Sequence, residues 1–492
     1  MQIVLFILQI VWGVCGLASI GVLGWGVWQY RQNSEDLAAV EQAKRIILYA
    51  SIGLGVSVVV SIILFVIQSN SHKPALSPLT GAPSSSNEEV VGLGERMGAS
   101  SQVSAHYPQR NAKDVPRNAS IVITFRDAIR LDSVAPSGVL NVSAVDIRVK
   151  NDDDTLSKEP LTGKAVLSSD KKTLKITPQP ALGSSEHSIL YRVQVTATVL
   201  KESGDSAFGS TGFYEWQFET GTTLDTIPPS VVGIFPGTTV NAVSYPRNAM
   251  IQVQFSESID ASVLEGGKLT VVDQAKGTPI DGVWTLGNAY TTLLFTPTET
   301  CGANTCGQKM YCLPERARVK VSIKAASLPT SMSADSSSPY RATEPFDGLV
   351  DLAGNSFDGG GERGTKKDGK ATGPATDSYF WTFGIGSALD ISLPRIASTT
   401  PRRDTPRVDR QTPLTITFSK QMDLGSLTPR SVLLGQDVNY WLSNTRDTTK
   451  DTTTTTIFHD PLKENTLYSP SVQSSARDAF QNCFNPCSGP LR

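Results

Sequence analysis

Three stretches of the chain are variants of one pattern: SIVITFRDAI at 120–129, MIQVQFSESID at 250–260 and LTITFSKQMD at 414–423. In each, apolar side chains alternate with other residues and the run ends on a phenylalanine: Phe125, Phe255 or Phe418. A period of two with β-branched and aromatic residues predicts a β-strand with one face buried. Because the intervals between the copies are too long for a solenoid, the repeat predicts separate, related domains.

Two further motifs recur around these strands. TLKITP (173–178), TLLFTP (292–297) and TIFHDP (456–461) each end in a proline, which cannot donate to a strand ladder and so closes the strand. EWQFETG (215–221) and FWTFGIG (380–386) close the first two units. Many short strands separated by turn residues predict an all-β fold of tandem antiparallel sandwiches.

The third unit has no W-x-F strand after DAFQN (478–482), so it is expected to lack its closing strand. Such a sandwich exposes a strand edge. Two interpretations remain open. A neighbouring copy of the chain supplies the strand by β-augmentation, or the unit is a shorter sandwich whose edge is closed by a Cys483–Cys487 disulfide.

These motifs resemble the bacterial Ig-like domains of S-layer and other surface proteins. The proline-containing openings HYP (106–108), IFP (234–236) and TTP (399–401), and the turn DLAGN (351–355), belong to the same resemblance. It implies sandwich modules that serve as spacers, adhesive stalks or wall components. It implies no catalytic residues.

The front of the chain has a different character. Two uncharged runs, Ile3–Trp28 and Ile46–Ile67, are each long enough to cross a bilayer as a helix, and predict a transmembrane hairpin. Arg31, Lys44 and Arg45 lie between them, which places that loop in the cytoplasm and both termini outside. We therefore expect a multi-pass protein of the cell membrane, whose ectodomain, residues 69–492, is extracellular.

The hairpin resembles the pilin subunits of type IV secretion systems over residues 3–68, with AKRIILYASIGL (43–54) opening its second helix. It departs from that family in lacking a long signal sequence and in carrying a large ectodomain. Gly53, Ser57 and Ser61 recur at intervals of four, which predicts a ridge where another helix approaches closely. That helix is either the first of the hairpin or one from a sister subunit.

The expected domain organisation has five parts. They are a transmembrane hairpin at 1–68, a flexible linker rich in Ser, Pro and Gly at 69–101, and Ig-like domains at 102–225, 226–390 (with insertions) and 391–492.

The charge balance narrows the choice of partners. With 46 acidic and 44 basic residues the chain is nearly neutral, which argues against nucleic acid. The expected partners are membrane lipid and sister subunits, reached through the helices or through an open strand edge. A surface protein or glycan ligand is not specified by the sequence.

The cysteines indicate an oxidising exterior. Cys301, Cys306, Cys312, Cys483 and Cys487 all follow the hairpin. Their spacing matches no paired metal motif and predicts disulfide-stapled loops. The expected pairs are Cys301–Cys306 and Cys483–Cys487, which leaves Cys312 free, although spacing alone does not fix connectivity.

No catalytic, cofactor or metal site is expected. The four histidines (72, 106, 187 and 459) are scattered, and GTKKDGKA (364–371) has the composition of a loop and not of a phosphate-binding turn. The acidic runs are 152–154 and Asp347, Asp351, Asn355 and Asp358. They suggest calcium but match no EF-hand, and the DLAGN residues are better explained as a turn.

The sequence thus predicts a non-enzymatic, membrane-anchored cell-surface protein that presents tandem Ig-like modules for structural or adhesive roles. One alternative is a pilin-like subunit of a type IV secretion system or surface appendage. Another is an anchored hydrolase with its site in the insertions at 301–377.

Overall fold

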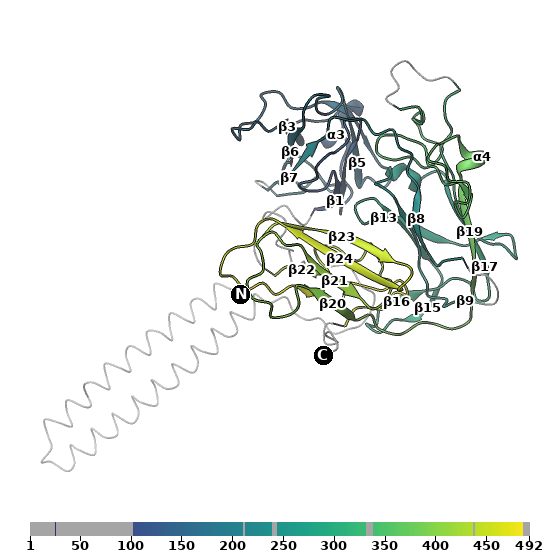
Figure 1. Cartoon of the computed structure of the whole chain (residues 1–492). Helices are drawn as coiled ribbons and strands as arrows, with labels where there is room; N and C mark the ends of the chain where they lie inside the picture. The colour runs from purple at the N-terminus through teal and green to yellow at the C-terminus, as the bar shows by residue number, and fades with distance from the viewer. Residues whose placement is uncertain are drawn as a thin grey trace, which may run out of the picture. The chain divides into compact units, whose positions relative to one another are not determined.

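A computed structural model describes Trp25 and residues 102–209, 212–238, 244–330, 338–435 and 438–485. The predicted hairpin and linker, including Gly53, Ser57 and Ser61, lie outside these residues except for Trp25. No helix within the described part is long and apolar enough to cross a membrane. The described part is mostly antiparallel β-structure, which confirms the predicted all-β class (Figure 1).

Module 1 comprises β1 to β7 and two short helical turns. One sheet has the order β1-β2-β5-β4 and the other β3-β6-β7. The elements are β1 (Val103–Tyr107), β2 (Ile121–Phe125), α3 (Leu131–Val134), η1 (Pro136–Gly138), β3 (Val145–Val149), β4 (Gly163–Leu167), β5 (Thr173–Pro178), β6 (Ile189–Val195) and β7 (Tyr214–Thr220).

Module 2 comprises β8 to β19. Its first sheet has the order β13-β14-β10-β8, and its second runs β12-β11-β17-β19-β18 with β9 also beside β19. The elements are β8 (Val231–Phe235), β9 (Ser244–Tyr245), β10 (Ile251–Phe255), η2 (Ala261–Leu264), β11 (Leu269–Asp273), β12 (Thr278–Pro279), β13 (Gly282–Gly287), β14 (Thr292–Pro297), β15 (Thr300–Ala303), β16 (Lys309–Tyr311), β17 (Arg318–Ile323), β18 (Gly361–Glu362), α4 (Pro374–Asp377) and β19 (Tyr379–Ile385).

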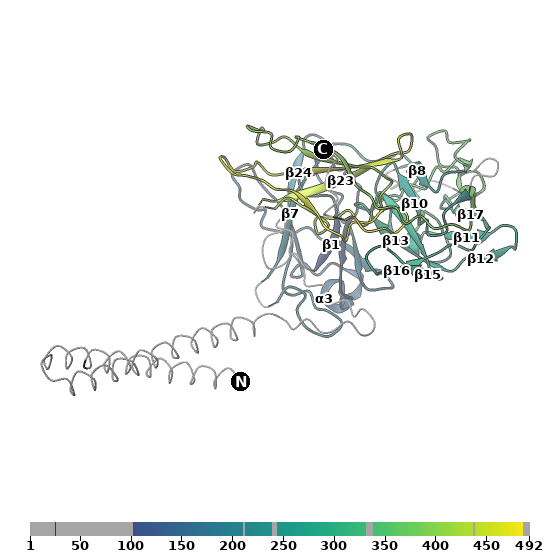
Figure 2. The same cartoon turned by 90° about the horizontal axis from the view of Figure 1, so that it is seen from below.

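Module 3 comprises β20 to β25. Its first sheet repeats the same order as β20-β21-β24-β23, and its second contains β22 and β25. Figure 2 labels β23 and β24, which are paired in the first sheet. The strands are β20 (Ile396–Thr400), β21 (Leu414–Phe418), β22 (Val432–Leu433), β23 (Tyr440–Asp447), β24 (Thr452–His459) and β25 (Ser471–Val472). In the part of module 3 that the structure describes, no strand follows β25 as β7 follows β6 and β19 follows β17.

The three repeated strands are central in their sheets. Each lies between the strand that opens its module and the strand that ends in proline, so β2 pairs with β1 and β5, β10 with β8 and β14, and β21 with β20 and β24. Their apolar residues point into three separate cores. Trp216 and Trp381, from the two predicted closing strands, are among the largest fully buried side chains.

The outward faces of these strands differ from the prediction. Alternation predicted half-buried strands, yet Val122 and Gln252, at matching positions on the faces turned away from their cores, are also buried. Val122 packs with Tyr290 and Leu352 of module 2, and the Gln252 side chain hydrogen-bonds the backbone of module 3. Thr415, the counterpart in the last module, is only half-buried. The outer face of a central strand is therefore covered where another module follows in the chain, as in modules 1 and 2.

The cysteines pair differently from the prediction. The expected surface loop at 301–312 forms the β15–β16 hairpin, and its register brings Cys301 beside Cys312, with 5.8 Å between their Cα atoms. Cys306, at the hairpin tip, instead bonds Cys483 of module 3. The expected Cys301–Cys306 pair and free Cys312 are therefore wrong. The expected Cys483–Cys487 pair is wrong as well, because Cys483 is taken; Cys487 lies outside the described residues.

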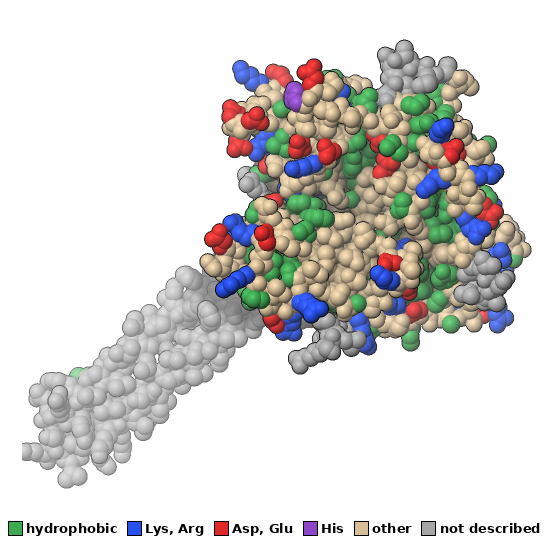
Figure 3. Space-filling view, viewed as in Figure 1, with side chains coloured by type: hydrophobic (Ala, Val, Ile, Leu, Met, Phe, Trp, Pro, Cys, Tyr) green, Lys and Arg blue, Asp and Glu red, His purple; other side chains and the backbone are tan. Residues whose placement is uncertain are grey.

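Charges of both signs are mixed on the surface. On the face shown in Figure 3, Lys and Arg side chains lie among Asp and Glu side chains and do not gather into a large patch of one sign. Basic patches of that kind are the electrostatic footprint of nucleic-acid binding. This face offers none.

His106 occupies an aromatic contact in module 1. Its ring centroid lies 4.1 Å from that of Trp216 and 5.5 Å from that of Tyr214. Nδ1 lies 2.8 Å from the carbonyl oxygen of Pro108. Burial, helped by the nearby Arg110 cation, lowers the pKa of His106 to about 3. The folded module thus holds this imidazole neutral.

We predict that module 1 loses stability as the pH falls below about 6.5, the ordinary histidine pKa. Between that value and about 3 the unfolded chain binds a proton that the folded chain does not, so stability rises with pH across this window. The pH dependence of thermal unfolding, followed by tryptophan fluorescence, measures it. His106→Phe should flatten this dependence, whereas the control His187→Gln, at an exposed site, should not. Equal slopes in His106→Phe and the wild type would contradict the assignment.

Candidate metal centre

The two module junctions repeat one another in detail. Module 1 and module 2 each carry a PRNA turn, residues 116–119 and 246–249, just before their central strands. The residue after the first turn, Ser120, donates its backbone N–H to the Leu352 carbonyl of module 2 at 2.9 Å. At the second junction Met250 donates in the same way to Ala479 of module 3, also at 2.9 Å. Each acceptor belongs to the D-x-x-x-N turn of the following module.

The asparagine of each PRNA turn fixes the segment that leads into the next module. Asn118 receives the backbone N–H of Asp225 on Oδ1 and donates Nδ2 to the carbonyl of the same residue. Asn248 makes the same pair of hydrogen bonds with Asp390. Asp225 and Asp390 are therefore equivalent residues, and both connections are held in place.

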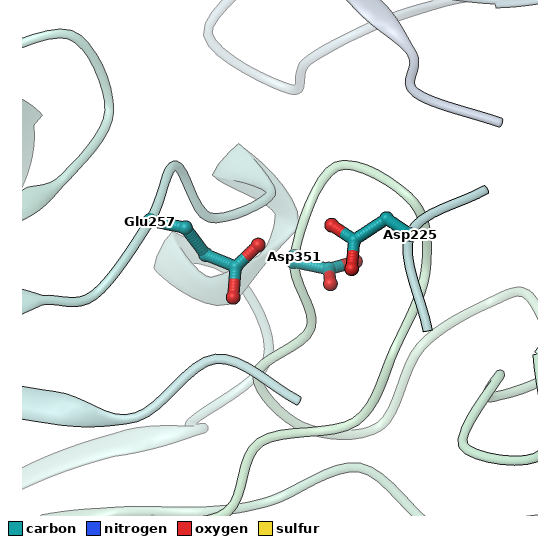
Figure 4. Close-up of side chains that lie close together, drawn as sticks. All are labelled: Asp225, Glu257 and Asp351. Atoms are coloured by element: carbon teal, nitrogen blue, oxygen red, sulfur yellow. The ribbon is translucent and has the colours of Figure 1, made fainter. Parts of the chain in front are cut away.

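Three carboxylates meet at the first junction. Asp225 lies between β7 and β8, Glu257 lies two residues after the end of β10, and Asp351 begins the DLAGN turn. Each contributes a carboxylate oxygen to a group in which all lie within 4.8 Å of one another. Figure 4 shows the three side chains facing one another from separate segments of the chain.

The DLAGN turn presents Asp351 rigidly. Its Oδ1 accepts the backbone N–H groups of Ala353 and Asn355, both at 2.8 Å, and its Oδ2 accepts Nδ2 of Asn355 at 2.7 Å. Gly354 takes a φ of +88°, the left-handed conformation that favours glycine. Asn355 is fully buried, and its Oδ1 has no hydrogen-bond partner.

The three carboxylates of this cluster lie close together in a partly buried place, which disfavours their charged forms. Burial, together with the charges of Asp351 and Asp225, raises the pKa of Glu257 to about 9. Burial and the charge of Asp225 raise the pKa of Asp351 to about 7. No ion pair within the described ranges reaches any of the three carboxylates. A group of oxygen donors with this excess of negative charge can hold a hard cation such as calcium.

At the second junction a lysine lies beside the equivalent carboxylates and balances part of their negative charge. Lys420, two residues after the end of β21, occupies the position that corresponds to Glu257. Its Nζ lies 2.5 Å from Oδ2 of Asp478 and 3.1 Å from Oδ1 of Asp390, the counterparts of Asp351 and Asp225. Burial raises the pKa of Asp478 even with this cation beside it. The lysine thus neutralises carboxylates that have little access to water.

Part of this arrangement could be predicted from the sequence. Asp351 and Asn355 were recognisable as turn residues, but Asp347 and Asp358, which were grouped with them, lie elsewhere: Asp347 pairs with Lys324 at 2.8 Å, and Asp358 accepts loop N–H groups. Asp225 and Glu257 were not predicted. The available signals were the repeated PRNA turn and the change from Glu to Lys at matching positions after the repeated phenylalanine.

A hydrolase site was considered in the insertions at 301–377, which are described in part. They supply the β15–β16 hairpin and the DLAGN turn, and residues 364–371 form turns and irregular chain, as predicted. The run at 152–154 is likewise an exposed turn, in which Asp153 accepts from Thr155.

Comparison with protein families identifies the modules. The bacterial Ig-like domain family matches residues 99–220, 225–306 and 390–488. The chain belongs to this family. The three matches begin close to β1, β8 and β20, so each Ig-like module is recognised separately. No curated protein matches the sequence.

Two solved structures show weaker similarity to the Ig-like chain. Domains 1–6 of the surface layer protein SbsC match with 10% identity over 94% of this chain and 62% of that chain, with a TM-score of 0.20. CopC from Methylosinus trichosporium OB3b matches with 12% identity over 24% of this chain and 91% of that chain, with a TM-score of 0.16. The family assignment depends on the sequence match and not on these structures.

We predict that Lys420→Met destabilises module 3 by roughly 3–5 kcal/mol, because it leaves the Asp478 and Asp390 carboxylates without their cation. The urea unfolding transition measures the loss. Lys450→Met is the matched control. That lysine is 77% exposed and pairs with Asp447 at the surface, so its loss should cost less than about 1 kcal/mol. Equal effects of the two substitutions would contradict the role given to Lys420.

Proposed function

We propose that this chain is a non-catalytic cell-surface protein in which three Ig-like modules form a stiff, stacked ectodomain. Its anchor would be the transmembrane hairpin predicted at 1–68. Membership of the bacterial Ig-like family supports a structural or adhesive role, and the disulfides support an oxidising location outside the cytoplasm.

One observation carries the proposal: the outer faces of β2 and β10 are buried beneath the following module. Domains in one chain move relative to one another unless their interface is extensive. Here Val122 adds an apolar contact, Gln252 adds two hydrogen bonds of 3.3 Å, and Cys306–Cys483 adds a covalent link between modules 2 and 3. Such an arrangement suits a spacer or stalk that holds its position under load.

A surface protein or glycan would contact loops, which carry most binding functions in sandwich folds. A sister subunit would add a strand to the edge of β25, beside which the described residues place no further strand. Cys483, which was expected to staple this edge to Cys487, is bonded to Cys306 instead.

Protease added to intact cells tests the location. Digestion should remove the modules, 102–492, and leave a fragment from the front of the chain that is protected by the membrane. An antibody against each end, with a cytoplasmic protein as the lysis control, distinguishes the fragments. Modules that stay intact on unbroken cells, yet are digested after lysis, would contradict the proposal.

A further inference from the structure

We propose that the first module junction binds a calcium ion through the carboxylates of Asp225, Glu257 and Asp351, and that this ion does the work that Lys420 does at the second junction. The inference depends on the geometry of the junction and not on the proposed location of the protein.

The two junctions are equivalent residue by residue. Backbone hydrogen bonds from Ser120 and Met250, and paired side-chain hydrogen bonds from Asn118 and Asn248, place the two connections in the same relation to their neighbours. The turns also match. Asp478 accepts the backbone N–H groups of Phe480 and Asn482 as Asp351 accepts those of Ala353 and Asn355.

The details around the linking aspartates match as well. Oδ1 of Asp225 accepts the backbone N–H of Ile227, and Oδ1 of Asp390 accepts that of Ser392. Asn355 and Asn482 each direct Nδ2 to the carbonyl of the linking aspartate, at 3.4 and 3.0 Å. Among these matched residues, the one that differs in charge lies two positions after the repeated phenylalanine: it is Glu257 in one junction and Lys420 in the other.

The position of the Lys420 ammonium at the second junction indicates where a cation would lie at the first. At the second junction Lys420 Nζ contacts Asp390, Asp478 and both the carbonyl and the hydroxyl of Ser392, so an ammonium sits among oxygen ligands. Its two carboxylates and one ammonium carry a net charge of −1. The first junction has three carboxylates, which carry a charge of −3 when all are ionised, and one divalent cation would bring the ionised group to −1.

The chemical type of the candidate ligands indicates which metal ion the first junction would bind. Every candidate ligand is an oxygen, and no cysteine or histidine belongs to the cluster, which favours calcium or magnesium over zinc. The Oδ1 atoms of Asn355 and of its counterpart Asn482 are both buried without a partner among the described residues, so the two junctions share this feature and the difference between them lies in the charged groups. The carboxylates come from three separate segments, and calcium tolerates such irregular coordination better than magnesium does.

The test measures calcium binding to the full chain in detergent. Calcium chloride is titrated into EGTA-stripped protein by isothermal titration calorimetry, with magnesium chloride in a parallel titration. Thermal unfolding is then recorded with EGTA and with calcium at about 100 times the measured Kd, where binding should raise the unfolding temperature by several degrees. Wild-type protein should bind calcium more tightly than magnesium.

Glu257→Lys provides the decisive variant, because the second junction already shows a lysine accommodated at this position. It should bind one calcium ion fewer than the wild type, and its unfolding temperature in EGTA should approach that of the calcium-loaded wild type. Glu257→Gln should weaken calcium binding at least tenfold without supplying a cation. The control Glu186→Lys makes the same charge change at an exposed loop residue and should leave binding unchanged.

Two results would overturn the proposal. One is a folded wild-type protein, verified by circular dichroism, that neither binds calcium nor changes its unfolding temperature. The other is a Glu257→Lys variant that binds calcium with the wild-type stoichiometry and affinity. Preferential binding of magnesium would overturn the choice of ion.

Discussion

The hydrogen bond from the residue after a PRNA turn to the D-x-x-x-N turn of the next module is the contact on which the arrangement depends. It occurs twice, from Ser120 to Leu352 and from Met250 to Ala479, at 2.9 Å in both cases. Each hydrogen bond brings three residues of its junction together. At the first junction they are Asp225, Asp351 and Glu257, and at the second Asp390, Asp478 and Lys420. The position of one module on the next and the electrostatics of the junction therefore have a common cause.

Stacking of the modules restricts which residues can occupy the outer faces of their sheets. An isolated Ig-like module keeps one face of each sheet in water, so its outer residues are free to vary. Here the outer face of β2 carries Val122 and that of β10 carries Gln252, and each is matched to the particular module that covers it. The junctions share backbone geometry but differ in side-chain chemistry, as Glu257 and Lys420 show. One scaffold thus supports one junction in which a lysine pairs with two carboxylates and one in which three carboxylates meet without a basic partner among the described residues.

Periodicity was sufficient to predict the fold, because each central strand buries one face in its own core and its alternation records that face. It could not predict the second, intermodule burial of Val122 and Gln252, since nothing local in a strand reports what covers its outer side. The cysteine pairing failed for a related reason. Sequence proximity favoured Cys301–Cys306, whereas the hairpin register and the contact with module 3 decide the true partners.

The candidate metal centre shows the same limit. Asp351 was recognisable as a turn residue, but Asp225 and Glu257 lie far from it in the chain and join it only when two modules meet.

Hydrogen exchange at the Ser120 and Met250 amides tests the central claim, that neighbouring modules are locked together. The account predicts protection as strong as that of the adjacent amides in β2 and β10. Exchange at these two amides as rapid as in exposed loops, while the strand amides stay protected, would show that the modules are not held against one another.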